Sequence, residues 1–445
     1  MVKVLNVALI FLCLIAGASV IFYAPMHLYD LITGAEAADG FFISWPFVRV
    51  LTEPIYAFSF YALTLNRNFY HPAIISWFWW VILAVFVYCG IRKRTIGQTF
   101  SSVFYAVMIL VSVFLFVALV PLPGPKLNKP EGFIAVDLHS HTMYSHDALS
   151  TPVSNLRFHE MQGYDSFFIT EHGHTKSFDK FPESARYKKV FPGVQMQTKD
   201  GVSVLLLSGK HFDGEEYTGK TLNEIIEKAH ENNMLVIMPH WWKWNRPALQ
   251  ELVALGIDGF EIYNCGYRYL TKEKLGQLIN ISKENNLLMV GSTDWHGWGY
   301  MTDVWTVISA KPEENLKDVL DKKSEIKVLV YREEQSASAL RFVFEPFAAF
   351  YYYIKNADVI SVLSLMVWAA LLSVLFAGST AKYIKKYTPP VMAAVMAVSA
   401  VVIYMSYIPA KEFNKIIPST VIPVLLGCCI LWLFVWRLNN GKNIQ

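Results

Sequence analysis

Histidines and carboxylates recur in this sequence directly after short apolar runs, where they could hold a metal ion. Apolar runs typical of buried strands span 133–138, 166–170, 202–207, 235–238, 259–262 and 287–291. Ligand-type residues close or follow five of these six runs: His139, His141, Glu171, His172, His240, Glu261, Asp294 and His296. Imidazole and carboxylate together suit Zn, Mn or Fe, whereas a Mg site would show carboxylates alone. The pattern therefore predicts a divalent transition-metal site.

The elements between these runs favour an α/β fold that gathers the ligands at one edge. Helical stretches at 152–162, 222–232, 247–254 and 272–284 alternate with the apolar runs, which we expect to be parallel strands. Alternation over about 200 residues is typical of a small barrel or an open sheet. The carboxyl ends of parallel strands meet on the face where α/β barrels build active sites. A His-x-His pair in extended chain also directs both rings to one side.

Six short motifs, taken in order, resemble those of the PHP (polymerase and histidinol phosphatase) phosphoesterases. They are His139-Ser-His141-Thr142, Ser145-His-Asp147, Ile169-Thr-Glu171-His172, Pro239-His240, Gly259-Phe-Glu261-Ile-Tyr-Asn264 and Gly291-Ser-Thr-Asp294-Trp-His296-Gly297. The resemblance covers residues 133–309 and implies a distorted (βα)7 barrel with a metal cleft that hydrolyses phosphoesters. It also implies the ligand sets: His139, His141 and Asp294 for one ion, Asp147, His172 and His296 for another, and His240 for a third position.

The sequence departs from the family pattern at the residue that bridges two metals. The family has Glu there, and this chain has Gln195 in Phe191-Pro-Gly-Val-Gln195. A neutral amide cannot bridge two cations as a carboxylate does, so we expect one or two ions rather than three. Glu171 replaces the family's Asp, which we interpret as a mild change behind the ligands.

Several further residues receive provisional roles. Asp294 and His240 are expected to act in catalysis as well as in metal binding, and Lys210 and Arg268 are candidates for holding phosphate. His159 lies on an expected helix and is predicted to be solvated, whereas Cys265 is interpreted as packing. The five cysteines form no disulfide framework or CxxC metal knuckle.

The distribution of charge indicates a membrane protein with one polar insert. The chain has 445 residues, of which 54% are apolar and 17% are charged. Of its 75 charged residues, 53 lie within 126–334. The net charge of +3, without a basic stripe, makes nucleic acid an unexpected partner. Six apolar runs are long enough to cross a bilayer: 4–23, 72–91, 100–121, 357–377, 389–408 and 417–436.

Basic clusters set the expected orientation and the domain limits. The clusters are Arg92–Arg94, Lys382–Lys386 and the C-terminal pair Arg437 and Lys442. If all are cytoplasmic, both termini lie inside and the insert lies outside. The expected organisation is a membrane region at 1–125, an extracytoplasmic domain at 126–335 and a second membrane region at 336–445.

The two membrane regions carry one motif twice. Arg49, Glu53, Pro54, Ala57, Phe58 and Tyr61 match Arg341, Glu345, Pro346, Ala349, Phe350 and Tyr353 with identical spacing. The expected unit is an interfacial helix, at 46–65 and again at 339–354, followed by two spans. Arg and Glu at i and i+4 would pair on one helical face.

These features favour a membrane-anchored, metal-dependent phosphoesterase that acts on envelope, lipid-linked or scavenged phosphoesters. The bilayer and a phosphorylated small-molecule or lipid-linked substrate are the expected partners, and the oligomeric state stays open. A different class remains as the alternative: a non-catalytic receptor whose altered site binds a phosphorylated ligand. Gln195 supports that alternative, whereas retention of seven other metal-type positions argues against it. A transporter is a third interpretation, supported only by the repeat.

Overall fold

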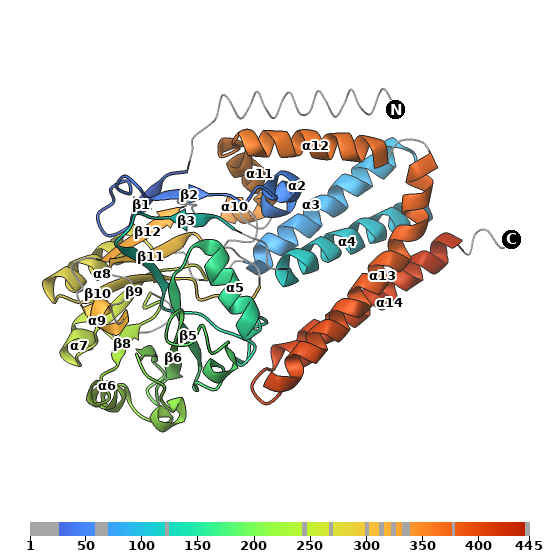
Figure 1. Ribbon diagram of the computed structural model, residues 1–445. Helices are drawn as coiled ribbons and strands as arrows, with labels where there is room; N and C mark the ends of the chain where they lie inside the picture. Colours follow the sequence, from blue (N-terminus) through green and yellow to red (C-terminus); the bar gives the residue numbers. More distant parts are fainter. Residues whose placement is uncertain are drawn as a thin grey trace.

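The computed structural model describes residues 26–57, 70–120, 124–242, 247–266, 270–298, 302–310, 316–321, 326–331, 339–375 and 379–440. It is a mixed α/β protein in which a curled sheet with its covering helices lies beside a group of long apolar helices (Figure 1). The run 4–23 lies outside the described residues, as does 58–65 of the first expected interfacial helix.

The main sheet has ten strands in the order β1-β12-β11-β4-β5-β6-β7-β8-β9-β10. In chain order these are β1 (Leu28–Asp30), β4 (Phe133–Asp137), β5 (Ser166–His172), β6 (Val190–Gln197), β7 (Ser203–Leu207), β8 (Leu235–Met238), β9 (Gly259–Asn264), β10 (Leu288–Ser292), β11 (Val304–Ser309) and β12 (Ile326–Tyr331). Two short strands, β2 (Phe42–Ser44) and β3 (Lys126–Asn128), pair separately. The fold is thus the expected α/β class, with a ten-stranded sheet where a (βα)7 barrel was expected.

Strand direction differs from the expectation at one place. The run 202–207 was expected to be parallel, but β7 is antiparallel to both β6 and β8. The reason is local: β6 and β7 are joined by a short turn, and a parallel pair would need a long crossover. β6, β11 and β12 were not predicted as strands at all. β4, β5, β6, β8, β9 and β10 nevertheless all run in one direction.

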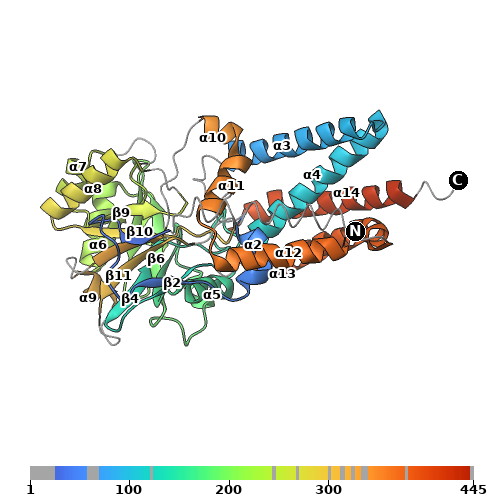
Figure 2. The same ribbon diagram turned by 90° about the horizontal axis from the view of Figure 1, so that it is seen from above.

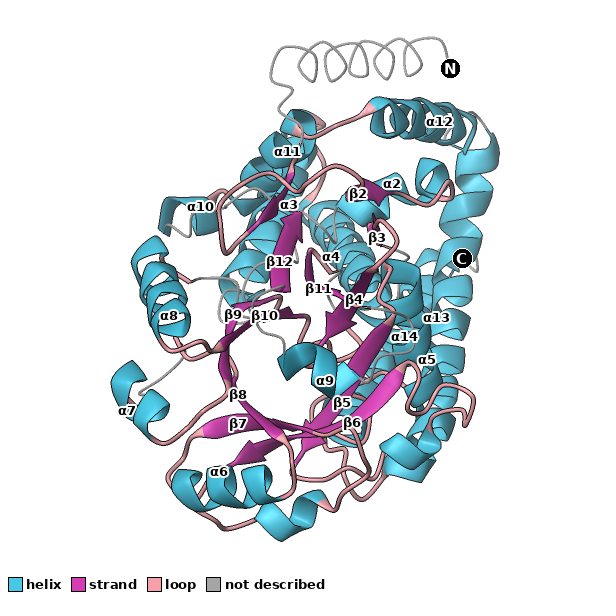
Figure 3. Cartoon of the chain, turned by 60° about the vertical axis from the view of Figure 1, so that its left-hand side comes forward, coloured by secondary structure: helices cyan, strands magenta, loops and turns pink. Residues whose placement is uncertain are grey.

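The sheet curls until β10 meets β11 and β12 (Figure 3). At this seam the Thr306 hydroxyl donates to the Gly291 carbonyl and accepts from the Gly291 N–H, both at 2.8 Å. Gly291 has no room for a side chain, because a Cβ there would lie 2.4 Å from a Val304 methyl group. The close approach of two strands therefore depends on glycine at this position.

Several described helices surround the sheet, and the one that leads to β5 is capped at both ends. They are α5 (Pro152–Gln162), α6 (Leu222–Glu231), α7 (Leu249–Ala254), α8 (Lys272–Glu284) and α9 (Leu316–Asp321). Thr151 caps α5 by accepting from Ser154 N–H, and Gly163 ends it in the left-handed conformation. α5, which leads from the loop after β4 back to β5, is thereby held at both ends.

Four described helices are long and apolar enough to cross a membrane. They are the segments Pro72–Ile91, Ile96–Leu119, Lys386–Ala410 and Ile417–Arg437. These segments consist mainly of α3 (Tyr70–Ile91), α4 (Ile96–Leu119), α13 (Ser379–Tyr407) and α14 (Ile422–Asn440). The expected span at 357–377 appears as α12 (Val359–Leu375), a shorter apolar helix. These four segments are compatible with a membrane protein.

The two copies of the repeat pack against one another reciprocally. The first copy's helix α2 (Arg49–Ala57) packs on α12, and the second copy's α10 (Ala339–Val343) and α11 (Glu345–Lys355) pack on α3. Trp368 Nε1 donates to the carbonyl of Leu51, while Ser76 Oγ donates to that of Val343, which occupies the equivalent position. The second copy is broken at Phe344 and is not the continuous helix that was expected.

Both expected Arg–Glu pairs form, but they are buried rather than exposed on a surface face. Arg49 Nε lies 2.5 Å from Glu53, and Arg341 Nε lies 3.1 Å from Glu345. Arg49 also contacts Asp358 at 2.8 Å at the start of α12. Arg49 thereby connects α2 to α12 through ion pairs, which allow its charge to lie in an apolar region.

Candidate metal centre

The ligand-type residues converge because the strands that carry them end at the same edge. His172 and Gln195 lie at the carboxyl ends of β5 and β6, and the other side chains follow β4, β8 and β10. The chain beyond β10 pairs with the chain beyond β4. Asp294 N–H donates to the His139 carbonyl at 2.8 Å, and His141 N–H donates to the Trp295 carbonyl at 2.9 Å. These two bonds place residues from distant parts of the sequence side by side.

The first group consists of His139, His141 and Asp294, all buried. Asp294 Oδ1 lies 3.3 Å from His139 Nε2 and 3.3 Å from His141 Nε2. Asp294 has a φ of +49°, a conformation that costs free energy for a residue with a side chain. Such local strain is common where a backbone must aim a functional group.

The second group lies beside the first and is open to solvent. Asp147 Oδ1 lies 3.4 Å from His172 Nε2 and 3.3 Å from His296 Nε2. The side chains of Asp147 and His172 are 32% and 28% exposed, while that of His296 is 1% exposed. The His141 ring stacks 4.5 Å from the His172 ring, so His141 can serve either group. The centre is thus a double site with a buried end and an open end.

Gln195 occupies the space between the first group and His240. Its Oε1 lies 3.3 Å from His139 Nε2, and its Nε2 lies 3.4 Å from His240 Nε2. His240 is buried, has a φ of +32° and donates its backbone N–H to Glu261 at 2.8 Å. The amide therefore adjoins both the first group and His240, where it supplies no negative charge.

The donor atoms of the centre fit a divalent cation. His141 Nε2 and Asp147 Oδ1 are buried and make no hydrogen bond with any described residue. Buried polar atoms normally have a partner, and a cation beside each of these atoms would supply it. Glu261 Oε1 lies 3.2 Å from His139 Nδ1, which leaves Nε2 to face Asp294. A carboxylate behind a histidine is the usual support for a metal ligand.

The electrostatics of the centre is dominated by crowded imidazoles and carboxylates. Burial lowers the pKa of His139, but Asp294 and Glu261 outweigh it and raise that pKa to about 9. Burial and the neighbouring His296 and His172 rings lower the pKa of His141 well below its usual value. Burial raises the pKa of Asp147, but the His296 and His172 imidazoles hold it far below its usual range. Asp147 is therefore ionised, as a metal ligand must be.

Supporting residues lie directly behind the ligands. The carboxylate of Glu171 is fully buried and accepts from Thr142 N–H at 3.0 Å, from the Thr142 hydroxyl and from Ser145 Oγ at 2.5 Å. Burial raises the pKa of Glu171, against these hydrogen bonds. It thus anchors the loop between His141 and Asp147. Glu261 was noted as a ligand-type residue but not assigned to the site, although a carboxylate within the buried strand β9 was the available signal.

Of the remaining predicted residues, those that the structure describes lie outside the candidate centre. Lys210 is exposed in the loop after β7, and none of its contacts with described residues reaches the centre. Arg268 lies outside the described residues. His159 was predicted to be solvated, but it is buried, with Nε2 2.9 Å from Asp137 Oδ2, because α5 packs its ring on Phe167. Cys265 is buried, as its interpretation as packing implies.

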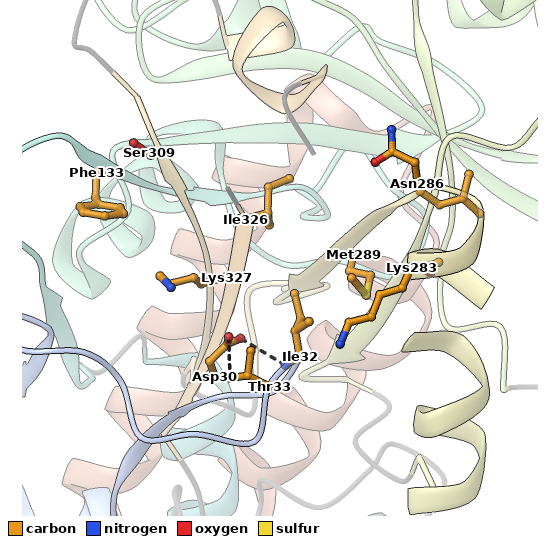
Figure 4. A pocket seen from close by; sticks show the side chains of 12 residues that line it. Asp30, Ile32, Thr33, Phe133, Lys283, Asn286, Met289, Ser309, Ile326 and Lys327 are labelled. Atoms are coloured by element: carbon orange, nitrogen blue, oxygen red, sulfur yellow. Dashed lines mark hydrogen bonds between the residues drawn. The ribbon is translucent and has the colours of Figure 1, made fainter. Parts of the chain in front are cut away.

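A cavity of about 520 Å³ lies at the opposite ends of the strands (Figure 4). Phe133, at the start of β4, and Met289, near the start of β10, line it together with Lys283 and Lys327. The histidines and Asp294 follow the other ends of these strands. This cavity is therefore separate from the candidate metal centre.

Comparisons with known proteins give structural neighbours only. No family model and no curated protein matches the chain. The solved structures that match include a two-domain protein from Bacteroides vulgatus containing a predicted PHP-like metal-dependent phosphoesterase, at 18% identity and a TM-score of 0.38, covering 48% of this chain and 69% of that one. An amidohydrolase from Chromobacterium violaceum matches at 11% identity and a TM-score of 0.32, over 44% of this chain and 98% of that one.

A third neighbour is the lesion-specific endonuclease PfuEndoQ from Pyrococcus furiosus, at 15% identity and a TM-score of 0.33. The match covers 44% of this chain and 57% of the endonuclease. At these values the matches do not place the chain in a family. The function must be argued from the centre itself.

Proposed function

We propose that this centre hydrolyses phosphoesters with one or two divalent transition-metal ions. His139, His141 and Asp294 would hold one ion, and Asp147, His172 and His296 would hold another. The observation that carries the proposal is the pair of buried atoms without hydrogen bonds, His141 Nε2 and Asp147 Oδ1, one in each group. Two adjacent cation positions would suit an in-line displacement, in which attacking and leaving oxygens both carry negative charge.

A cation bound there would lower the pKa of water to about 7 and neutralise phosphoryl oxygens. The chain's own residues supply the rest of the chemistry. Glu261 holds the His139 ring through Nδ1 at 3.2 Å, so that Nε2 keeps its direction. Glu171 fixes the loop that carries Asp147. His240 adjoins Gln195 at the far edge of the first group, where its ring could take or give a proton during the reaction.

The proposal places this centre in a membrane-anchored enzyme. The domain at 126–335 would lie outside the cytoplasm, between membrane regions at 1–125 and 336–445, and both termini would lie inside. The four apolar segments support anchoring. The basic residues Arg92–Arg94 lie in the turn between α3 and α4, far from the sheet, which supports the orientation (Figure 2).

Gln195 favours a second candidate function, that of a receptor that binds a phosphorylated ligand without turnover. The amide lies within 3.4 Å of His139 and His240, where a carboxylate would attract a further cation. Metal analysis of the purified full-length protein, together with assays on an aryl phosphomonoester and an aryl phosphodiester, tests both candidates. Bound metal with turnover supports the enzyme, bound metal without turnover supports the receptor, and absence of both contradicts each of them.

A further inference from the structure

The turn between α13 and α14 is bonded to the loop that carries Asp147. This turn, residues 411–416, joins two of the candidate spans. Asn414 Nδ2 donates to three carbonyls of the loop: those of Met143 at 3.1 Å, Ser145 at 2.9 Å and Ala148 at 2.7 Å. The N–H groups of the next two residues, 415 and 416, donate to the His146 carbonyl at 3.0 and 3.1 Å. The loop is therefore held by the membrane region as well as by its own domain.

Apolar packing reinforces this contact. Met143 and Tyr144 of the loop form one buried cluster with Ala410 and Ile417, the last and first residues of the two candidate spans. Phe413 of the turn lies against the Tyr144 ring and 4.4 Å from the His174 ring. Figure 1 shows the hairpin of α13 and α14 ending against the sheet and its helices. The buried cluster makes the contact a packed interface rather than a chance approach of two loops.

The lengths of the spans place this contact at the surface of the bilayer. Lys386–Ala410 has 25 residues and Ile417–Arg437 has 21. As helices they extend about 37 and 31 Å, enough to cross a hydrocarbon core of about 30 Å. The six-residue turn that joins the two spans is the part that contacts the sheet domain. The turn, and the loop bonded to it, must then lie at the level of the lipid headgroups.

The open end of the metal centre is the end that touches this turn. His139 and His141 are fully buried, but exposure rises through His172 and Asp147 to His146, whose side chain is 55% exposed. The His146 carbonyl is the atom that accepts from residues 415 and 416. Lys415 is itself exposed, and its backbone N–H lies 3.0 Å from the His146 carbonyl oxygen that it donates to. A cation from the membrane region therefore lies beside the entrance to the centre.

We propose that the substrate is a phosphoester headgroup carried by a lipid of the same bilayer, with Lys415 binding the headgroup at the entrance. The inference rests on the proposed phosphoesterase function. Water would add its hydroxyl group to phosphorus as the bond between phosphorus and the lipid alcohol breaks. The leaving oxygen would keep the bonding electron pair and take the remaining proton of the water. A free, water-soluble phosphoester is the competing source of the same chemical group.

Lipids that share one headgroup but differ in acyl-chain length distinguish a bilayer lipid from a water-soluble phosphoester as the substrate. The full-length protein is reconstituted in phosphatidylcholine vesicles and assayed with phosphatidic acid and with phosphatidylglycerol, each with C16 and with C4 acyl chains. For the headgroup that reacts, we expect kcat/KM to be at least about tenfold higher with C16 chains, because the bilayer presents them at the entrance. Equal or faster hydrolysis of the soluble C4 form overturns the lipid assignment but leaves the phosphoesterase intact. Failure of all four lipids while aryl phosphoesters react overturns it as well.

Substitution of Lys415 tests the entrance itself. Lys415→Gln should lower kcat/KM for the reactive C16 lipid about tenfold, the loss expected for one charged hydrogen bond. Lys411→Gln, on an exposed residue of the same turn, is the matched control and should change it less than about twofold. Equal effects of the two variants would contradict a specific role for Lys415. If the unsubstituted protein hydrolyses none of the lipids and none of the aryl phosphoesters, the proposed function itself is overturned.

Discussion

At the scale of single residues, each group of the centre contains one carboxylate that lies close to two imidazoles. Asp294 Oδ1 is equidistant from His139 and His141, and Asp147 Oδ1 lies between His172 and His296. Each carboxylate is therefore a shared element, and removing it disturbs two imidazoles at once. Effects of substitutions within one group should not add, because the members act as a unit.

His139→Ala and Asp294→Ala should each abolish hydrolysis without preventing membrane insertion, since either change leaves the same ion under-coordinated. The double variant should lose little more activity than either single variant. Initial rates on an aryl phosphoester and bound metal per protein are the measurements. Clearly additive losses would show that the two residues do not share an ion.

Gln195→Glu should raise metal occupancy at nearly constant side-chain volume. Two divalent cations near each other repel, and a carboxylate between His139 and His240 would offset several kcal/mol of that repulsion at about 4 Å, with an effective dielectric of about 20. Bound metal is measured with and without the substitution, at fixed total metal, and activity should rise if the centre is catalytic. Gln195→Met is the matched control of similar size without a charge. Unchanged occupancy in Gln195→Glu would place the residue away from the cations.

Metal binding should release protons near neutral pH, because the pKa of His139 is raised to about 9. In the metal-free folded protein this ring is protonated at pH 7. Its stabilising contribution is fully present below the unfolded pKa of about 6.5 and is lost as pH rises through about 9. A metal ion must displace that proton, so affinity should increase with pH up to about 9. Calorimetric titration in two buffers of different ionisation enthalpy should show about one proton released per ion at pH 7, and an affinity independent of pH between 7 and 9 would contradict this.

At the scale of elements, the seam between β10 and β11 determines where Asp294 and His296 emerge. Gly291 lies at that seam, immediately before Ser292, Thr293 and Asp294, and its backbone is bonded to Thr306 Oγ1. The register of β10 against β9 also shifts between Val290 and Gly291. The placement of Asp294 therefore depends on how closely the two strands approach at Gly291, three residues before it.

Gly291→Ala should lower the free energy of unfolding by about 1–3 kcal/mol, the usual cost of inserting a carbon into a packed core. The added Cβ would lie 2.4 Å from a Val304 methyl group and 2.7 Å from one of Val328. Gly276→Ala in α8, where a Cβ meets nothing within 4 Å, is the control and should be neutral or stabilising. Thermal unfolding of the two variants gives the comparison, and equal stability would refute a tight seam.

At the scale of the whole molecule, the group of long apolar helices contacts the loop of the candidate centre that carries Asp147. The turn at 411–416 contacts the Asp147 loop, while the opposite ends of α3 and α14 carry Arg92–Arg94 and Arg437. The basic residues thus lie at the ends of these helices that are far from the candidate site. The reciprocal packing of the two repeat copies joins the apolar helices before the sheet domain to those after it.

A reporter placed within residues 311–323 should be active only outside the cytoplasm, because the basic clusters favour the inner side. Paired fusions with a reporter active only in an oxidising compartment and one active only in the cytoplasm measure this. A fusion at Lys442 is the control and should give the reverse pattern. Activity of the 311–323 fusion in the cytoplasm would invert the orientation and remove lipids of the outer leaflet as substrates.

The sequence by itself determined the α/β class and which residue types gather at the candidate site. Residues such as His139, Asp294 and His296 directly follow apolar runs, and such placement is a local property that periodicity reveals. The long apolar runs were visible for the same reason, since composition within about 20 residues suffices to predict a span.

Only the tertiary structure decided which distant residues meet. The antiparallel direction of β7, the burial of His159 against Asp137 and the placement of Gln195 between His139 and His240 depend on strand pairing, which a local pattern does not encode. The contact of Asn414 with Met143, Ser145 and Ala148 joins residues more than 260 positions apart. Hydrogen bonds from one amide to three carbonyls leave no periodic signal in the chain, because only the folded backbone brings those carbonyls together.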